Sequence, residues 1–125
     1  MDAEKKNSRV LQDCLAKAQN LSELVEYSRD SIVSKTILDK TAGTITLFAF
    51  DKGQKLSEHT TPYDAVVQVL DGKARIIIGG KDNYVSSGEL IIMPANVPHS
   101  VVADEQFKML LIMIRTKEEK EGIRS

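Results

Sequence analysis

From residue 30 onward, short apolar runs alternate with turn-forming residues. The apolar runs lie near residues 32–39, 44–50, 65–70, 74–78, 83–85, 90–93, 98–103 and 107–114. Strands spaced about eight to ten residues apart are typical of an all-β sandwich or barrel. No helix-length segment separates the runs, as βαβ units would require. The pattern therefore predicts a single all-β domain over residues 30–116.

Two glycine-containing dipeptides predict tight chain reversals within this domain. Asp71-Gly72 lies between two apolar runs, and Asp-Gly in that setting is a strong hairpin signal. Gly79-Gly80 also suits a tight turn, because glycine adopts positive φ without steric cost. We therefore expect a hairpin at each dipeptide.

Several of the predicted strands are apolar on both faces. Residues 65–70, 76–78 and 109–114 show little alternation of apolar and polar side chains. An antiparallel sheet with one face in water should alternate, so both faces of these strands must be covered. One face would line a barrel interior. An N-terminal helix or a second subunit would cover the other, and we expect a homodimer because a chain of this length offers little else.

The first 29 residues predict a helical extension that packs against the barrel. Ser8 can serve as an N-cap, and Asn20 is a plausible stop. Apolar residues follow helical spacing between them, which predicts a short N-terminal helix over residues 8–19. They are Val10, Leu11, Cys14, Leu15 and Ala18. Residues 117–125 form a tail of mixed charge that we expect to be solvated.

Composition excludes several classes of partner. The 125 residues include 17 basic and 18 acidic side chains, so no positive excess favours nucleic acid or an anionic membrane. No helix-turn-helix accompanies the strands, and no apolar run reaches the ~18 residues of a membrane span. The charged N-terminus does not resemble a signal peptide, and the single cysteine excludes an internal disulfide. We therefore expect a cytoplasmic protein without a nucleic-acid or membrane partner.

The chain contains only two histidines, and each lies beside a predicted turn. His59 follows the turn that ends at Gly53, and the two-residue strand period places it on one face with Thr61. His99 follows a second turn, Pro94 to Pro98, and begins another predicted strand. Two histidines on facing strands can converge inside a barrel.

The glycines and prolines around the histidines match two known sequence motifs in part. The first motif is Gly, five residues, His, any residue, His, three or four residues, Glu, six residues, Gly. Gly53, His59 and Gly72 match it. Thr61 replaces the second His, and Ala65 replaces the Glu. The second motif is Gly, five residues, Pro, any residue, Gly, two residues, His, three residues, Asn. Gly88, Pro94 and His99 match it. Asn96 replaces the second Gly, and Ala103 replaces the Asn. Asparagine is well tolerated at the positive φ that the glycine would adopt.

These residues resemble the cupin superfamily of small jelly-roll β-barrels, and the likeness covers about residues 44–114. The chain is most similar to the small stand-alone cupin-2 type barrels of bacteria, many of which have no assigned activity. The resemblance implies an all-β fold, a single cupin (jelly-roll) β-barrel. It also implies a divalent metal ion, such as iron, manganese, zinc or nickel, held by the motif His, His, Glu and His.

Only two of those four metal ligands are present. His59 and His99 fall short of the three or four protein ligands of zinc sites, and of the two-His-one-carboxylate set of non-haem iron. Asp64 is a possible third ligand, one residue from the expected glutamate. Strand parity places Asp64 on the opposite face unless the Pro62-Tyr63 turn breaks that parity.

Three functional hypotheses remain open. The first is a small-molecule site with a degenerate metal centre, in which neutral imidazoles bind a polar or anionic ligand by hydrogen bonds. Its expected pocket residues are His59, Thr61, Tyr63, Met93 and His99. The second is a metal-dependent cupin enzyme of the dioxygenase, isomerase or decarboxylase type. The third is a structural or dimer-forming domain, and the sequence assigns no catalytic residue.

Overall fold

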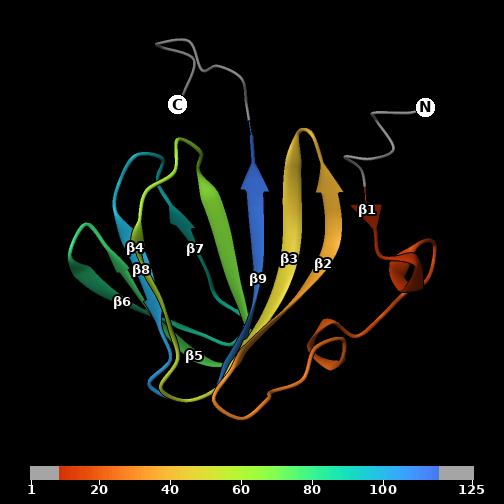
Figure 1. Ribbon diagram of the computed structural model, residues 1–125, viewed down its shortest axis with the longest axis horizontal. Coiled ribbons are helices and arrows are strands. Elements are labelled where there is room, and N and C mark those ends of the chain that lie inside the picture. Colours follow the sequence, from red (N-terminus) through yellow and green to blue (C-terminus); the bar gives the residue numbers. More distant parts are fainter. Residues whose placement is uncertain (1–8, 116–125) are drawn as a thin grey trace.

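The computed structural model describes residues 9–115, and antiparallel strands dominate it (Figure 1). In chain order the elements are β1 (Arg9–Val10), η1 (Gln12–Cys14), η2 (Leu21–Glu23), β2 (Ile32–Lys40), β3 (Gly43–Phe50), β4 (Lys55–His59), β5 (Ala65–Ile78), β6 (Lys81–Ser86), β7 (Leu90–Met93), β8 (His99–Val102) and β9 (Phe107–Ile114). The two η elements are single 3-10 turns. The all-β prediction is confirmed.

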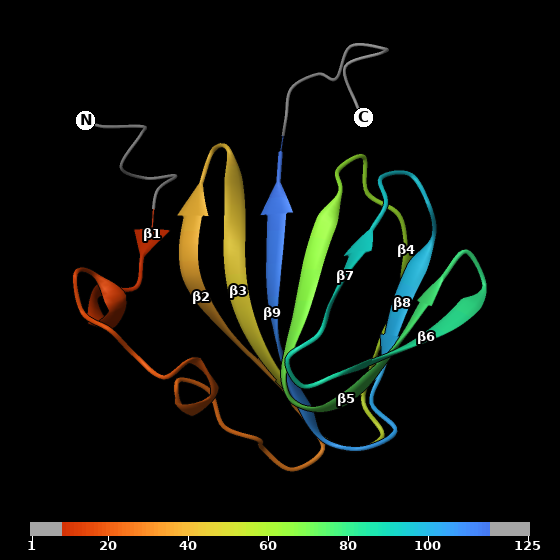
Figure 2. The same cartoon turned by 180° about the vertical axis from the view of Figure 1, so that it is seen from behind.

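The strands form two sheets that share the long strand β5. The first half of β5 pairs with β7 and β9, and the sheet continues through β3, β2 and β1; we call it sheet A. The second half of β5 pairs with β6 and β8, and β8 pairs with β4; we call it sheet B. The sheets meet near the middle of β5 and diverge away from it (Figures 1 and 2).

The predicted hairpin at Asp71-Gly72 is wrong. Strand β5 runs through both residues, with a shift of register against β9 between Val69 and Asp71. Gly72 adopts a φ of +77°, and a Cβ there would collide with the carbonyl oxygen of Gln106. The glycine thus supports an irregularity that passes β5 from one sheet to the other. The Gly79-Gly80 turn is confirmed, with φ values of 59° and 83° between β5 and β6.

The predicted helix over residues 8–19 is also wrong. Arg9 and Val10 pair with Asp39 and Leu38 at the edge of β2, and the described chain then makes only 3-10 turns. A helix of about 12 residues is marginal by itself, and strand pairing satisfies backbone groups that such a helix would leave at its ends. Within residues 9–115, no helix has the length and apolar character needed to cross a membrane. Ser8 and the predicted tail at 117–125 lie outside the described residues.

Two apolar clusters cover the two faces of sheet A. The larger cluster fills the interior between the sheets, and we call the face of sheet A that contributes to it the inner face. The smaller cluster lies on the outer face. It joins side chains of β2, β3, β5 and β9 to four residues that follow Asn20 in the N-terminal segment: Leu21, Leu24, Val25 and Tyr27. The N-terminal segment therefore covers part of the outer face, by turns rather than by a helix.

Polar contacts fix this N-terminal segment to the sheet. The Tyr27 hydroxyl donates to the Asp71 carboxylate at 2.5 Å. The Lys108 ammonium donates to the Ser22 carbonyl at 2.6 Å and lies 5.0 Å from the centre of the Tyr27 ring. Lys35 donates to the Leu24 carbonyl at 3.2 Å. These bonds hold the segment against the outer face, so that the inner face is left to form the site.

Candidate functional site

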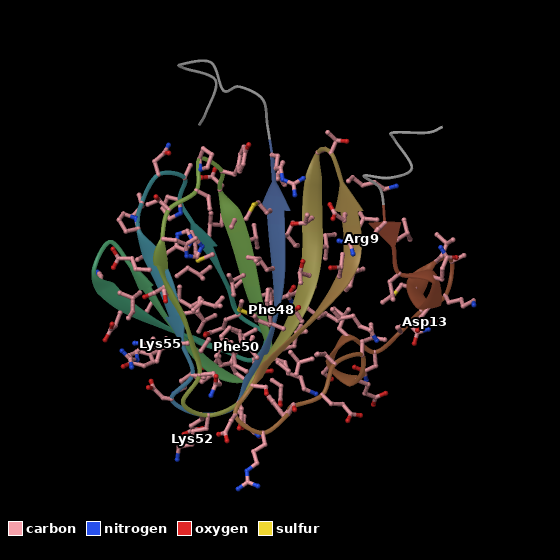
Figure 3. The ribbon with its side chains drawn as sticks, in the orientation of Figure 1. Arg9, Asp13, Phe48, Phe50, Lys52 and Lys55 are labelled. Carbon is pink, nitrogen blue, oxygen red and sulfur yellow. The ribbon has the colours of Figure 1, made fainter. Side chains whose placement is uncertain are left out.

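One end of the barrel interior is closed by packed side chains. Phe50 and Phe107 are fully buried, and their rings stack with centroids 4.5 Å apart. Val69 and Met109 form the next cross-strand pair and are also buried. Figure 3 shows Phe50 between the two sheets near the point where they meet. No ligand can enter through this end without displacing the core.

Both histidines lie at the other end of the interior. Strand β4 ends at His59, and residues 60–64 connect it to Ala65 at the start of β5. Residues 94–98 likewise connect Met93, at the end of β7, to His99 at the start of β8. Ala65 and Met93 are cross-strand partners, as are His59 and His99. We call this part of the barrel the histidine end.

The structure brings the two imidazoles into contact. Their ring centroids are 4.5 Å apart and the rings lie edge to face, at 70°. His99 is 3% exposed, whereas His59 is exposed to solvent. One ring is therefore a wall of the interior, and the other is reachable from outside.

Each imidazole is oriented by a backbone carbonyl two residues before it. His59 Nδ1 lies 3.0 Å from the Ser57 oxygen, and His99 Nδ1 lies 3.1 Å from the Val97 oxygen. A carbonyl oxygen can only accept, so Nδ1 of each ring carries the proton and donates it. In the neutral rings, Nε2 is then left with a free lone pair that can accept a hydrogen bond or bind a metal ion.

Burial lowers the pKa of His99 below its usual value of 6.5. The hydrogen bond to the Val97 carbonyl favours the charged ring and opposes this effect, while the neighbouring His59 lowers the pKa further. His99 is therefore neutral near pH 7. The hypothesis of a small-molecule site requires this, because only a neutral imidazole can accept a hydrogen bond from a ligand.

The loop after His59 uses its own polar groups. Because β4 ends at His59, the strand parity expected to extend to Thr61 does not apply. The Thr61 hydroxyl donates to the Tyr63 carbonyl at 2.9 Å and accepts from the Tyr63 N–H at 3.4 Å. The Asn96 N–H donates to the Thr61 carbonyl at 2.7 Å, which ties the two loops together. Thr61 and Tyr63 thus shape the loop, and Met93 is a buried part of the wall.

Asp64 also ties the two loops together. Its carboxylate accepts a hydrogen bond from the Ala95 N–H at 2.8 Å. Across residues 9–115, no three His, Cys, Asp or Glu side chains converge as a metal site would require. Asp64 is therefore not brought to the histidines as a third ligand. Ala65, where the resemblance expects a glutamate, is buried and offers only a methyl group.

Part of the wall at the histidine end consists of residues that were not among those expected from the sequence. Thr44 pairs with Met113 on sheet A, and Met113 pairs with Ala65, so all three share one cross-strand row. The available signal was the alternation of Thr44 and Thr46 with apolar residues, which places both threonines on one face. A separate groove of about 460 Å³ lies along β6 and β7, and no histidine lines it.

Comparison with known proteins identifies relatives of the same architecture. The Cupin_2 family model, described as a cupin domain, matches residues 46–115. None of the curated proteins compared with the chain matches it.

Three solved structures illustrate the similarity. A conserved protein of unknown function from Streptococcus pyogenes is 36% identical, with a TM-score of 0.79 over 83% of this chain and 91% of that one. A cupin 2 conserved barrel domain protein from Leptotrichia buccalis is 44% identical, with a TM-score of 0.75; the match covers 78% of this chain and only 47% of that protein. A cupin superfamily protein from Desulfitobacterium hafniense is 23% identical, with a TM-score of 0.80 over 86% of this chain and 99% of that one, and supports the fold alone.

Proposed function

The chain belongs to the Cupin_2 family of cupin domains, and we propose that it binds a small molecule at the histidine end of its barrel. The observation that carries this proposal is the contact between His59 and His99, each with Nδ1 engaged by a carbonyl. The two Nε2 atoms are then available to accept hydrogen bonds from hydroxyl or amide groups of a ligand. Such bonds are stronger beside a buried ring than in water.

The metal ion that the family implies does not fit the residues present. Two imidazoles supply two ligands, and the Thr61 hydroxyl is already used within its own loop. Ala65 supplies none, and Asp64 accepts from the Ala95 N–H. The alternative of a metal-dependent enzyme therefore lacks a third protein ligand among the described residues.

Ligand-observed NMR with a panel of neutral, anionic and cationic fragments tests the proposal. With EDTA present, we expect fragments to bind the wild type and to bind His59→Ala at least about 10-fold more weakly, which corresponds to about 1.4 kcal/mol. His59 is exposed, so the variant should fold. Leu15→Ala truncates an exposed side chain of the N-terminal segment, away from the groove along β6 and β7, and is the control.

Equal binding by the wild type and His59→Ala would remove the histidine pair from the site. Metal content measured on the same samples tests the alternative. A stoichiometric transition metal that survives dialysis of the wild type and is lost from His59→Ala would favour the metal-dependent enzyme.

A further inference from the structure

The inner face of β2 and β3 presents hydroxyl groups at the histidine end. Ile45 and Leu47 belong to the outer cluster, so the alternating Thr44 and Thr46 face inward. Thr46 pairs directly with Thr36 of β2. All three threonines are only partly buried, which leaves their side chains accessible.

An apolar strip runs beside these threonines. Met113 pairs with Thr44, and Leu111 pairs with Thr46 on the neighbouring strand β9. Phe48 lies on the same face one row further in, and its ring centroid is 6.0 Å from that of Phe50; both residues are labelled in Figure 3. Phe48, Leu111 and Met113 are partly buried, whereas the deeper Phe50 is fully buried. The accessible wall is thus half hydroxylic and half apolar.

The charged residues in the rows of this wall pair with each other at the edge of sheet A. Asp39 pairs with Thr44 across β2 and β3, and Arg9 binds its carboxylate at 3.1 Å. The other residues of the same rows on sheet A are uncharged. A charged ligand moved from water to this wall would lose hydration, and it would have to break this pair to gain an opposite charge.

We infer that the ligand is an uncharged molecule with several hydroxyl groups and one apolar face; this rests on the function proposed above. Its hydroxyls donate to Nε2 of His59 and His99, and exchange hydrogen bonds with Thr36, Thr44 and Thr46. Its apolar face packs on the strip formed by Phe48, Leu111 and Met113. Because the ligand is uncharged, its binding buries no unpaired charge against this wall.

NMR titration of the ¹⁵N-labelled protein at pH 7.5 with EDTA tests this inference. The probes are glucose, glucuronate, glucosamine and tetrahydropyran, which share a ring and differ in charge and hydroxylation. We expect glucose to bind at least 5-fold tighter than each of the others. Thr44→Val and Thr46→Val remove a hydroxyl at constant shape and should each weaken glucose about 3-fold or more. Thr41→Val, at the exposed turn between β2 and β3, should leave glucose binding unchanged.

Every other outcome overturns this inference. The fragment panel tests the proposed function separately. Tighter binding of glucuronate, glucosamine or tetrahydropyran rejects an uncharged hydroxylated ligand. Valine variants that bind glucose as the wild type does, while His59→Ala binds it weakly, reject the threonine wall and keep the histidine site. If no probe shifts any resonance, the inference fails, and the fragment panel alone decides whether the histidine end binds small molecules.

Discussion

At the scale of single residues, the site depends on two imidazoles held in one tautomer. The sequence placed His59 and His99 at turn-flanked positions, and the structure brings them to 4.5 Å. The sequence could not show that the backbone carbonyls of Ser57 and Val97 orient the rings, because those hydrogen bonds depend on the exact course of the chain. The same local geometry explains why Thr61 turns to its own loop.

The lowered pKa of His99 predicts a loss of stability on mild acidification. Its pKa is below 6.5 in the folded protein, so the unfolded chain binds this proton more readily. The stabilising contribution is therefore complete above about pH 6.5 and is lost as pH falls toward the folded pKa. The pKa values of Asp51 and Asp104 are also lowered, but from 3.8, so their contributions are lost only at more acidic pH.

Urea unfolding at pH 7.5 and pH 5 measures this effect. The wild type should lose more stability between the two pH values than His99→Gln, which cannot take up the proton. His59→Gln removes a neighbour that lowers the pKa of His99, so its loss should lie between those of the wild type and His99→Gln. Identical losses in the wild type and His99→Gln would show that His99 titrates alike in the folded and unfolded chains.

At the scale of elements, Gly72 lets β5 serve both sheets. Gly72→Ala would require an alanine at a φ of +77° and a collision with the Gln106 carbonyl. Gly88 has a φ of +91° but no atom within 4 Å of the added Cβ. A left-handed alanine alone costs about 1–2 kcal/mol, so Gly88→Ala should lower the free energy of unfolding by about that amount.

Gly72→Ala should cost clearly more than Gly88→Ala, because the collision adds to the backbone strain. Thermal and urea unfolding of both variants measure the difference. Equal destabilisation would mean that the backbone near Gly72 shifts freely, and that the bend of β5 does not depend on this glycine.

The same glycine shows how far local patterns predict elements. Gly79-Gly80 was correctly expected to form a hairpin, and Asn96 adopts the positive φ of 65° expected at a glycine position. Asp71-Gly72 carries an equally strong local signal, yet pairing with β9 on one side and with β6 on the other keeps the strand continuous. Likewise, the apolar spacing of residues 8–19 suits a helix, but β2 offers Arg9 and Val10 a strand partner. Long-range pairing decided both cases.

At the scale of the whole molecule, an apolar patch remains on the outer face of sheet A. Ile92, Val66 and Ile112 form one cross-strand row over β7, β5 and β9. Leu90, Ile92 and Ile114 are 59%, 54% and 56% exposed. The N-terminal segment contacts the neighbouring part of this face. We propose that a second copy of the chain covers the patch and forms the homodimer expected from the sequence.

Light scattering coupled to gel filtration tests the dimer. The wild type should have the mass of two chains, and Ile92→Lys should have the mass of one, because a lysine at the centre of the patch would be buried without a partner. Leu15→Lys, at an exposed apolar residue of the N-terminal segment, should remain dimeric. A wild type with the mass of a single chain at tens of micromolar would reject the interface.

The most direct test of the central claim is an NMR spectrum of the imidazole nitrogens, recorded with EDTA while the tightest fragment from the panel is added. In the free protein, the neutral form of each ring should carry its proton on Nδ1. On addition of the fragment, both Nε2 resonances should shift and then saturate. Nε2 resonances that stay fixed with EDTA, and move only after a divalent metal ion is added, would contradict a hydrogen-bonding histidine site.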